Sequence, residues 1–304
     1  MDSRPPPPPL PKRRLTALDW LLFGLVALGI GLVVWRVNAV LVYDWNWPRV
    51  FGFVARFDEE RGQWVANLLL QGLLTTIRLA FWGTILAALI GLVMGWWRTC
   101  DSLALRIISR TYVELIRNIP PLVFIFIFYF FIASQIFPAI GLETINTKSP
   151  WVDNTAFRIA FGDPALFTNF LSGLICLALF EAAYITEIVR AGIQSVPKGQ
   201  WEAGRAIGLS PTSLLRDIIF PQALRKILPP LAGQFITLIK DSAIISLISV
   251  QELTFLATEV AASTTKVFET WILVGGMYFA LCYLFAFIFA RLERRAGRSA
   301  RQET

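Results

Sequence analysis

The sequence predicts an all-α membrane protein with about six transmembrane helices. Of its 304 residues, 56% are hydrophobic and 16% are charged, whereas about 25% of the residues of a typical globular chain are charged. A water-soluble fold of this length cannot hide so much apolar surface, so the expected solvent is a lipid bilayer. The composition therefore excludes a soluble enzyme, a disordered protein and a secreted disulfide scaffold.

The first apolar run follows a proline-rich start. Residues 1–17 contain the run Pro5–Pro9, which predicts a disordered, extended and solvated tail on the cytoplasmic side. A helix over residues 18–35 would be about 27 Å long at about 1.5 Å per residue, which is enough to span a bilayer. A cleaved signal peptide is the alternative, but Trp35 and Arg36 lie where a small, neutral cleavage site is required. Residues 18–66 are therefore expected to form an extra N-terminal span and a periplasmic segment.

Five further apolar runs follow in the rest of the chain. Core helices of a large soluble protein are the alternative, which the number of runs and the composition disfavour. Proline is tolerated in the first turn of a helix, so Pro120-Pro121 and Pro229-Pro230 are expected to open the third and the fifth span. The five runs cover approximately residues 67–97, 119–137, 171–193, 227–250 and 271–290.

The distribution of Lys and Arg predicts the orientation in the membrane. If the N-terminus is cytoplasmic, the cytoplasmic segments hold 19 Lys and Arg residues and the outer segments hold 7. Cytoplasmic loops of membrane proteins carry an excess of these residues. Both termini are therefore expected in the cytoplasm, where residues 292–304 form a basic tail.

The composition also limits the chemistry. The net charge of +7 does not indicate a nucleic-acid partner, because the basic residues lie between apolar runs, as in membrane loops. The chain has no His, which removes imidazole bases, Ser-His triads and His metal sites. Its Cys residues have no CxxC spacing and are interpreted as packing residues rather than as ligands or disulfides. They are Cys100, Cys176 and Cys282. We expect no enzyme activity, metal or cofactor in this chain.

The longest cytoplasmic loop, residues 194–226, is predicted to fold. Gly199 and Glu202 have the spacing of an N-cap and a third helical residue, and Gly208 is placed to end this helix. Ser210 then caps a second short helix. Two short helices hinged at Gly208 indicate a docking surface.

The second short helix of this loop has its own start and stop signals. Pro211 occupies its first position, and Leu214, Leu215, Ile218 and Ile219 form an apolar stripe at helical spacing. Pro221 is expected to end it.

The loop resembles the signature loop of permease subunits in binding-protein-dependent ABC importers. That signature has an EAA triplet, three residues, Gly, nine residues, Ile, any residue and Leu-Pro. The same spacing is present here, with Gly204 in place of the third triplet residue and Phe220 in place of Leu. The resemblance implies a role in coupling to an ATPase for Glu202, Ala203, Gly204, Gly208, Ile218 and Pro221.

Flanking stretches resemble the polar amino acid uptake branch of the same family. They are residues 72–76, 117–123, 183–193, 195–200 and 238–242. The resemblance covers approximately residues 67–291. It implies that these residues form a type I ABC importer transmembrane domain in a bacterial inner membrane, with residues 194–226 as its coupling loop and one extra N-terminal span.

The resemblance also implies amino acid import with several partners. A periplasmic binding protein would deliver the amino acid, and a cytoplasmic ABC ATPase dimer would power transport. A second permease subunit, a copy or a relative, would complete the path through the lipid. The chain has no GxxxxGK[ST] phosphate loop, so ATP is expected on the partner ATPase. The signature loop would lie in a groove of that ATPase and transmit its closure to the spans.

Charged residues inside the predicted spans are candidates for the substrate path, because such groups usually line a cavity or pair with each other. Arg78 lies roughly 10 Å from the outer surface, where its side chain either snorkels outward or faces the path. Glu181 and Lys240 both lie near mid-membrane, and Asp241 follows directly. These charges form either a buried salt bridge or a site that holds a zwitterionic amino acid.

Two other classes of function compete with this interpretation. A stand-alone secondary transporter or channel would need no ATPase, which leaves the folded loop unexplained. A membrane-embedded enzyme would lack obvious reactive groups, because the chain has no His and no carboxylate-rich loop.

Overall fold

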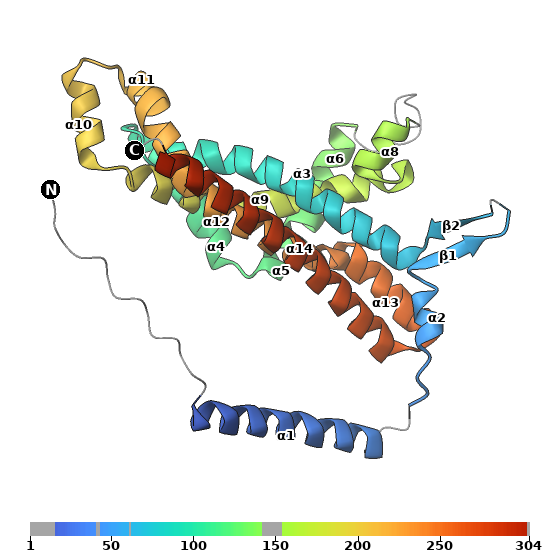
Figure 1. Cartoon of the computed structure of the whole chain (residues 1–304). Coiled ribbons are helices and arrows are strands. Elements are labelled where there is room, and N and C mark those ends of the chain that lie inside the picture. The colour runs from blue at the N-terminus through green and yellow to red at the C-terminus, as the bar shows by residue number, and fades with distance from the viewer. Residues whose placement is uncertain (1–15, 41–42, 61, 142–153, 303–304) are drawn as a thin grey trace. The chain divides into compact units, whose positions relative to one another are not determined.

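The computed structural model describes residues 16–40, 43–60, 62–141 and 154–302 (Figure 1). It divides into two compact units, residues 1–45 and 46–304. Helix α1 (Ala17–Val40) lies in the first unit. The backbone N–H of Thr16 donates to the Asp19 carboxylate at 2.7 Å, and the backbone N–H of Asp19 donates to Thr16 Oγ1 at 3.4 Å. This reciprocal capping starts the helix. Residues 1–15 of the predicted tail lie outside the described residues.

The second unit begins with a short helix and a hairpin. Helix α2 (Trp47–Phe51) precedes strands β1 (Ala55–Asp58) and β2 (Gln63–Ala66), which pair antiparallel. The prediction of spans alone did not include this small sheet. Asn67 joins the end of α2 to the next helix, because its side-chain amide donates to Gly52 O at 2.7 Å and its side-chain carbonyl accepts from Leu68 N at 2.9 Å.

Two long helices form the centre of the second unit. Helix α3 (Leu68–Trp97) packs along helix α9 (Phe167–Gln194). A Cβ atom added at Gly91 would lie 2.5 Å from Ile185 Cγ2, and one at Gly95 would lie 2.6 Å from Val189 Cβ. The two backbones therefore approach each other more closely than any larger residue would permit, as small residues allow in membrane bundles.

The remaining helices pack around this pair. Those before α9 are α4 (Leu103–Asn118), α5 (Pro121–Ile127), the π-helix η1 (Phe128–Ala133), α6 (Ser134–Ala139), α8 (Thr155–Phe161) and the 3₁₀-helix η3 (Pro164–Leu166). Those after α9 are α10 (Lys198–Ala206), α11 (Pro211–Ser213), the π-helix η4 (Leu214–Ile219), α12 (Phe220–Asp241), the 3₁₀-helix η5 (Ser242–Ile248), α13 (Leu253–Thr264) and α14 (Val267–Gln302).

Among the described residues, six helical segments are long and apolar enough to cross a membrane. Each overlaps one of the predicted runs, which confirms the predicted number of spans. The segments are Ala17–Arg36, Leu68–Trp97, Pro121–Ala139, Pro164–Gln194, Pro211–Ile248 and Val267–Arg295.

The prolines of the fifth span do not lie where we expected. Pro229 and Pro230 lie inside α12 rather than at its start. They remove the amide donors for the carbonyls of Arg225 and Lys226, and all four residues are exposed. The prediction that Pro221 ends a helix is also wrong, because it occupies the first turn of α12, where proline is tolerated.

Candidate functional site: the coupling loop and the polar groups of the spans

The cytoplasmic loop folds as two helices that meet at Gly208. Figure 1 shows α10 and α11 at the end of the second unit opposite the β1–β2 hairpin. The N–H of Gly208 donates to Arg205 O at 3.0 Å, and the N–H of Leu209 donates to Gly204 O at 3.2 Å. Gly208 has φ 79°. These are the two hydrogen bonds and the left-handed residue of a Schellman C-cap, so the prediction that Gly208 ends the first loop helix is confirmed.

The N-terminal caps of the two loop helices were predicted with different success. Ser210 caps the second helix as predicted, since its hydroxyl accepts from Ser213 N at 3.2 Å. The expected cap at Gly199 is wrong, because α10 begins at Lys198 with Pro197 as the N-cap residue. Proline presets the backbone for the first turn, which moves the helix start ahead of the glycine.

The loop has a core that is continuous with the spans. Gly204 is buried, and an added Cβ would lie 2.3 Å from Leu214 Cδ1. This contact explains why a glycine occupies the third position of the triplet. Leu214 and Ile219 are buried in one cluster with residues of α3 and α9. A displacement of the loop therefore acts directly on the packed spans.

The signature residues divide between this core and the exposed surface. Ile218 is half-buried, and it packs against the cluster with Trp201. The exposed ones lie on α10, on the turn after it and at the start of α12. They are Glu202, Ala203, Gly208 and Pro221. Ile207, directly before the hinge, is 73% exposed. This surface therefore exposes an isoleucine together with the signature residues.

Two hydrogen bonds hold the loop against α12. Lys226 Nζ donates to Ser195 O, at the end of α9, at 2.7 Å. Gln222 Nε2 donates to Gln200 Oε1 of α10 at 3.2 Å. The segment from Pro211 to Ile248 is helical throughout, so the second loop helix and the fifth span form one rod.

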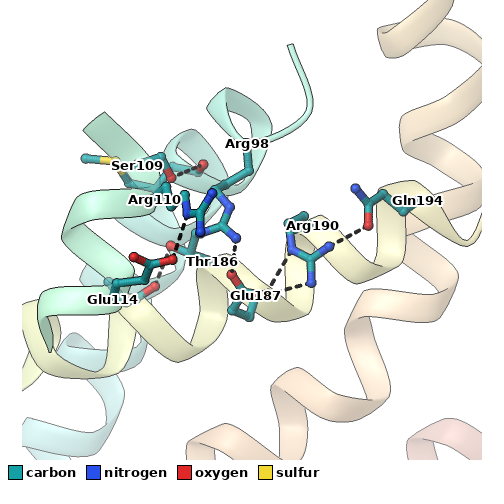
Figure 2. Close-up of polar contacts among 10 residues, drawn as sticks. Arg98, Ser109, Arg110, Glu114, Thr186, Glu187, Arg190 and Gln194 are labelled. Atoms are coloured by element: carbon teal, nitrogen blue, oxygen red, sulfur yellow. Dashed lines mark hydrogen bonds and ion pairs between the residues drawn. The ribbon is translucent and has the colours of Figure 1, made fainter. Parts of the chain in front are cut away.

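A charge network joins α3 to α9 close to the loop, and the sequence analysis missed it (Figure 2). Glu187 lies between two arginines, with Arg98 Nη2 at 3.1 Å and Arg190 Nη2 at 2.8 Å. Arg190 also donates to Gln194 Oε1 at 2.5 Å. The Arg98 and Glu187 side chains are 18% and 20% exposed, so this pair is partly shielded from water. The spacing of Glu187 and Arg190 at i and i+3 was the available signal.

Glu181 is buried in α9 and contacts the fifth span. Gln234 donates to its Oε2, while its Oε1 is buried without a hydrogen-bond donor among the described residues. Asp241 is close enough to interact with it electrostatically. The Lys240 side chain is exposed. The structure therefore brings Glu181 together with Gln234 and Asp241, and the described residues contain no Glu181–Lys240 ion pair.

Arg78 lies apart from this group. Its Nε donates to Ile159 O at 2.8 Å, in the last turns of α8. The neighbouring indole of Trp82 donates to Ala160 O at 3.0 Å and stacks on Phe161. Arg78 therefore holds α8 against α3 instead of joining the polar group at Glu181.

The apolar helices and the folded loop at one end define a multi-pass membrane permease. Residues 87–298 match the family model described as "Binding-protein-dependent transport system inner membrane component". The chain belongs to this family. It is 32% identical to the glutamine transport system permease protein GlnP of Escherichia coli (strain K12) over 83% of this chain and 97% of that protein. It is 34% identical to the probable glutamine ABC transporter permease protein GlnP of Bacillus subtilis (strain 168) over 80% of this chain and 98% of that protein.

Solved structures agree with this assignment. A crystal structure of an amino acid ABC transporter matches with a TM-score of 0.59 at 30% identity, over 75% of this chain and 94% of that chain. An inward-facing structure of the MetNI methionine ABC transporter has the same fold, with a TM-score of 0.53 at 20% identity over 75% of this chain and 95% of that chain.

These similarities establish the function in outline. The chain is the permease subunit of a bacterial amino acid ABC importer, with the type I importer fold, and is a multi-pass membrane protein. Membership excludes a stand-alone transporter or channel. It also implies a binding protein and an ATPase as partners, and the chain itself is a membrane component rather than an enzyme.

Proposed function

We propose that this chain lies in the inner membrane with both termini in the cytoplasm and imports an amino acid of the glutamine type. A periplasmic binding protein delivers the substrate, and a second permease subunit, a copy or a relative, completes the path. A cytoplasmic ATPase dimer binds ATP and docks on the loop of residues 194–226. No cofactor is bound by this chain. The substrate class is supported by the names of the relatives, which are glutamine permeases.

The folded loop is the observation that carries the proposal. It presents Glu202, Ala203 and Ile207 on its exposed surface, while Gly204 and Leu214 anchor it to the spans. An exposed apolar residue beside charged ones is suited to a groove on a partner protein. Because Gly204 packs on Leu214 and the second loop helix continues into the fifth span, movement in that groove is passed to the membrane through packed contacts.

Glu181 supports a substrate path through the spans. Its unpaired buried oxygen and the neighbouring Asp241 place two carboxyl groups together with a neutral amide donor. Two carboxylates at close range repel each other, so a cation between Glu181 and Asp241 is favoured. The ammonium group of an amino acid supplies such a cation together with N–H donors. Lys240 takes no part in this group, and Arg78 belongs to a different end of the path.

Reconstitution tests the proposal. The chain would be purified with its ATPase and its partner permease, placed in liposomes with ATP inside, and supplied outside with the binding protein and labelled L-glutamine. We expect ATP-dependent uptake that requires the binding protein. A preparation that hydrolyses ATP but accumulates none of the twenty amino acids would overturn the proposed function.

A further inference from the structure

A cavity lined by both polar and apolar side chains lies at the end of the second unit that carries the β1–β2 hairpin and the start of α3, which the charge count places outside. Its volume is about 250 Å³, below the range of about 300–1,000 Å³ typical of sites for drug-sized ligands. A smaller cavity adjoins it and shares five of its residues. A ligand that fits here is therefore small.

The polar lining comes from three elements that are distant in sequence. Gln71, Thr75 and Arg78 lie on one face of α3, at spacings of four and three residues. Arg158 of α8 and Asp163, which caps the following 3₁₀-helix, form a second part. Gln251, in the turn before α13, forms the third.

Buried Glu252 fixes the wall beside Gln251. It caps α13 by accepting from Phe255 N at 2.8 Å, and it accepts from the Tyr278 hydroxyl at 2.7 Å and from Thr76 Oγ1 at 3.3 Å. Burial raises the pKa of this carboxyl, which the hydrogen bond from Tyr278 opposes. Glu252 therefore ties the wall that holds Gln251 to α3, α13 and α14.

Arg78 is the residue that gives this cavity a ligand preference. Its Nε donates to Ile159 O at 2.8 Å, and a Cβ added at Gly162 would lie 3.2 Å from Nη1. Gly162 has φ 91°, so a glycine is favoured at this contact with the guanidinium. Within the described residues, Nη1 and Nη2 donate no hydrogen bond and pair with no carboxylate. A guanidinium with two free parallel donors is suited to bidentate binding of a carboxylate.

We propose that this cavity binds the α-carboxylate of the imported amino acid through Arg78, before the substrate reaches Glu181. This rests on the proposed function. Arg78 places a guanidinium in the lining of the cavity, so an anionic group is favoured beside it, while Asp163 accepts the ammonium group. Glu181 lies fifteen residues beyond Leu166 along α9, about 22 Å at about 1.5 Å per residue. A small amino acid cannot contact the cavity and Glu181 at the same time, so it would bind at the two sites in succession.

Binding measured without the binding protein tests this site. The permease–ATPase complex in nanodiscs would be titrated with L-glutamine, and with L-glutaminamide, which has the same side chain but no carboxylate. We expect the acid to bind and the amide to bind on the order of tenfold more weakly, about 1.4 kcal/mol. Arg78→Gln should remove this discrimination, and Arg78→Lys should restore part of it. Asp163→Asn should weaken binding of both the acid and the amide, because it removes the charge that accepts the ammonium group, and this test holds even if Arg78→Gln does not assemble.

Arg56→Gln is the matched control, because it removes the same charge from an exposed position on β1 outside the cavity lining. Equal binding of acid and amide to the wild type, or the same loss in Arg56→Gln as in Arg78→Gln, would overturn the site. Absence of saturable binding by the wild type, together with uptake when the binding protein is present, would also overturn it and leave the proposed function standing.

Discussion

Gly208 has a backbone conformation that L-residues with a side chain adopt at a cost, with φ 79°, and no heavy atom lies within 4 Å of an added Cβ. A substitution there therefore changes backbone strain rather than packing. For an L-residue the left-handed region costs roughly 1–2 kcal/mol, and a β-branched side chain adds to this.

Gly208→Val is therefore expected to distort the hinge and to uncouple ATP hydrolysis from transport, since the exposed helix no longer meets the ATPase in register. The measurement is the ratio of transported substrate to ATP hydrolysed in liposomes. Gly199→Val is the matched control, because Gly199 lies in α10, the helix that Gly208 ends, also has open space around an added Cβ and lacks a positive φ. A normal ratio in Gly208→Val would contradict the hinge role.

The Glu181 group gives a second prediction at this scale. Glu181→Gln keeps the shape and a hydrogen-bond acceptor for Gln234, so the complex should assemble with little change in melting temperature but lose at least tenfold in uptake. Lys240→Met should also assemble, because Lys240 is exposed and holds no ion pair with Glu181. Glu259→Gln, an exposed acid on α13, is the control. Unchanged uptake by Glu181→Gln would refute a role in the substrate path.

The neighbours of Glu181 could not be predicted from the sequence. Counting residues from the span ends placed Glu181 and Lys240 at a similar depth, but depth does not specify direction around a helix. Consecutive residues point about 100° apart at 3.6 residues per turn, and it is Asp241 that faces Glu181. Gln234 carries no charge, so no signal in the sequence distinguished it.

At the scale of elements, the contact between α3 and α9 depends on glycines. An added Cβ at Gly91 would lie 2.8 Å from Ile185 Cβ and 3.2 Å from Ile185 C. Because the second distance involves backbone, no side-chain rotation can relieve it.

Gly91→Ala should therefore push the two helices apart and destabilise the protein by about 1–3 kcal/mol. Gly275→Ala is its control, since Gly275 lies in α14 with no atom within 4 Å of an added Cβ. There the change should stabilise the helix by up to roughly 1 kcal/mol. The measurement is the melting temperature of the two variants in detergent. An equal change at both positions would show that the close approach of α3 and α9 at Gly91 does not determine stability.

Hydrophobicity predicted the spans well and the elements between them poorly. Apolar runs identify all six candidate spans, because length and hydropathy are what a bilayer requires. Helices α4 and α13 were not predicted. Helix α4 carries three arginines, and α13 is short, with 12 residues. Pro229 and Pro230 were misplaced because sequence rules treat paired prolines as a boundary, whereas here they lie on an exposed face of a continuing helix.

At the scale of the whole molecule, the topology yields a prediction. A reporter fused after Thr304 and one inserted before Lys12 should both be cytoplasmic, because 19 Lys and Arg residues lie in the segments assigned to that side and 7 in the others. A reporter inserted at Glu60, between β1 and β2, should be periplasmic. Either terminus appearing outside would contradict the six-span arrangement.

The continuous helix from Pro211 onward has a mechanical consequence. The 31 residues to Asp241 form a rod roughly 46 Å long at about 1.5 Å per residue. A tilt of about 5° at the loop would move its far end by about 4 Å, more than the length of a hydrogen bond, about 3 Å. Asp241, beside Glu181, lies at that far end. Under the proposed function, the rod would act as a lever, since a short stroke at the ATPase would be sufficient to break and remake polar contacts at Glu181.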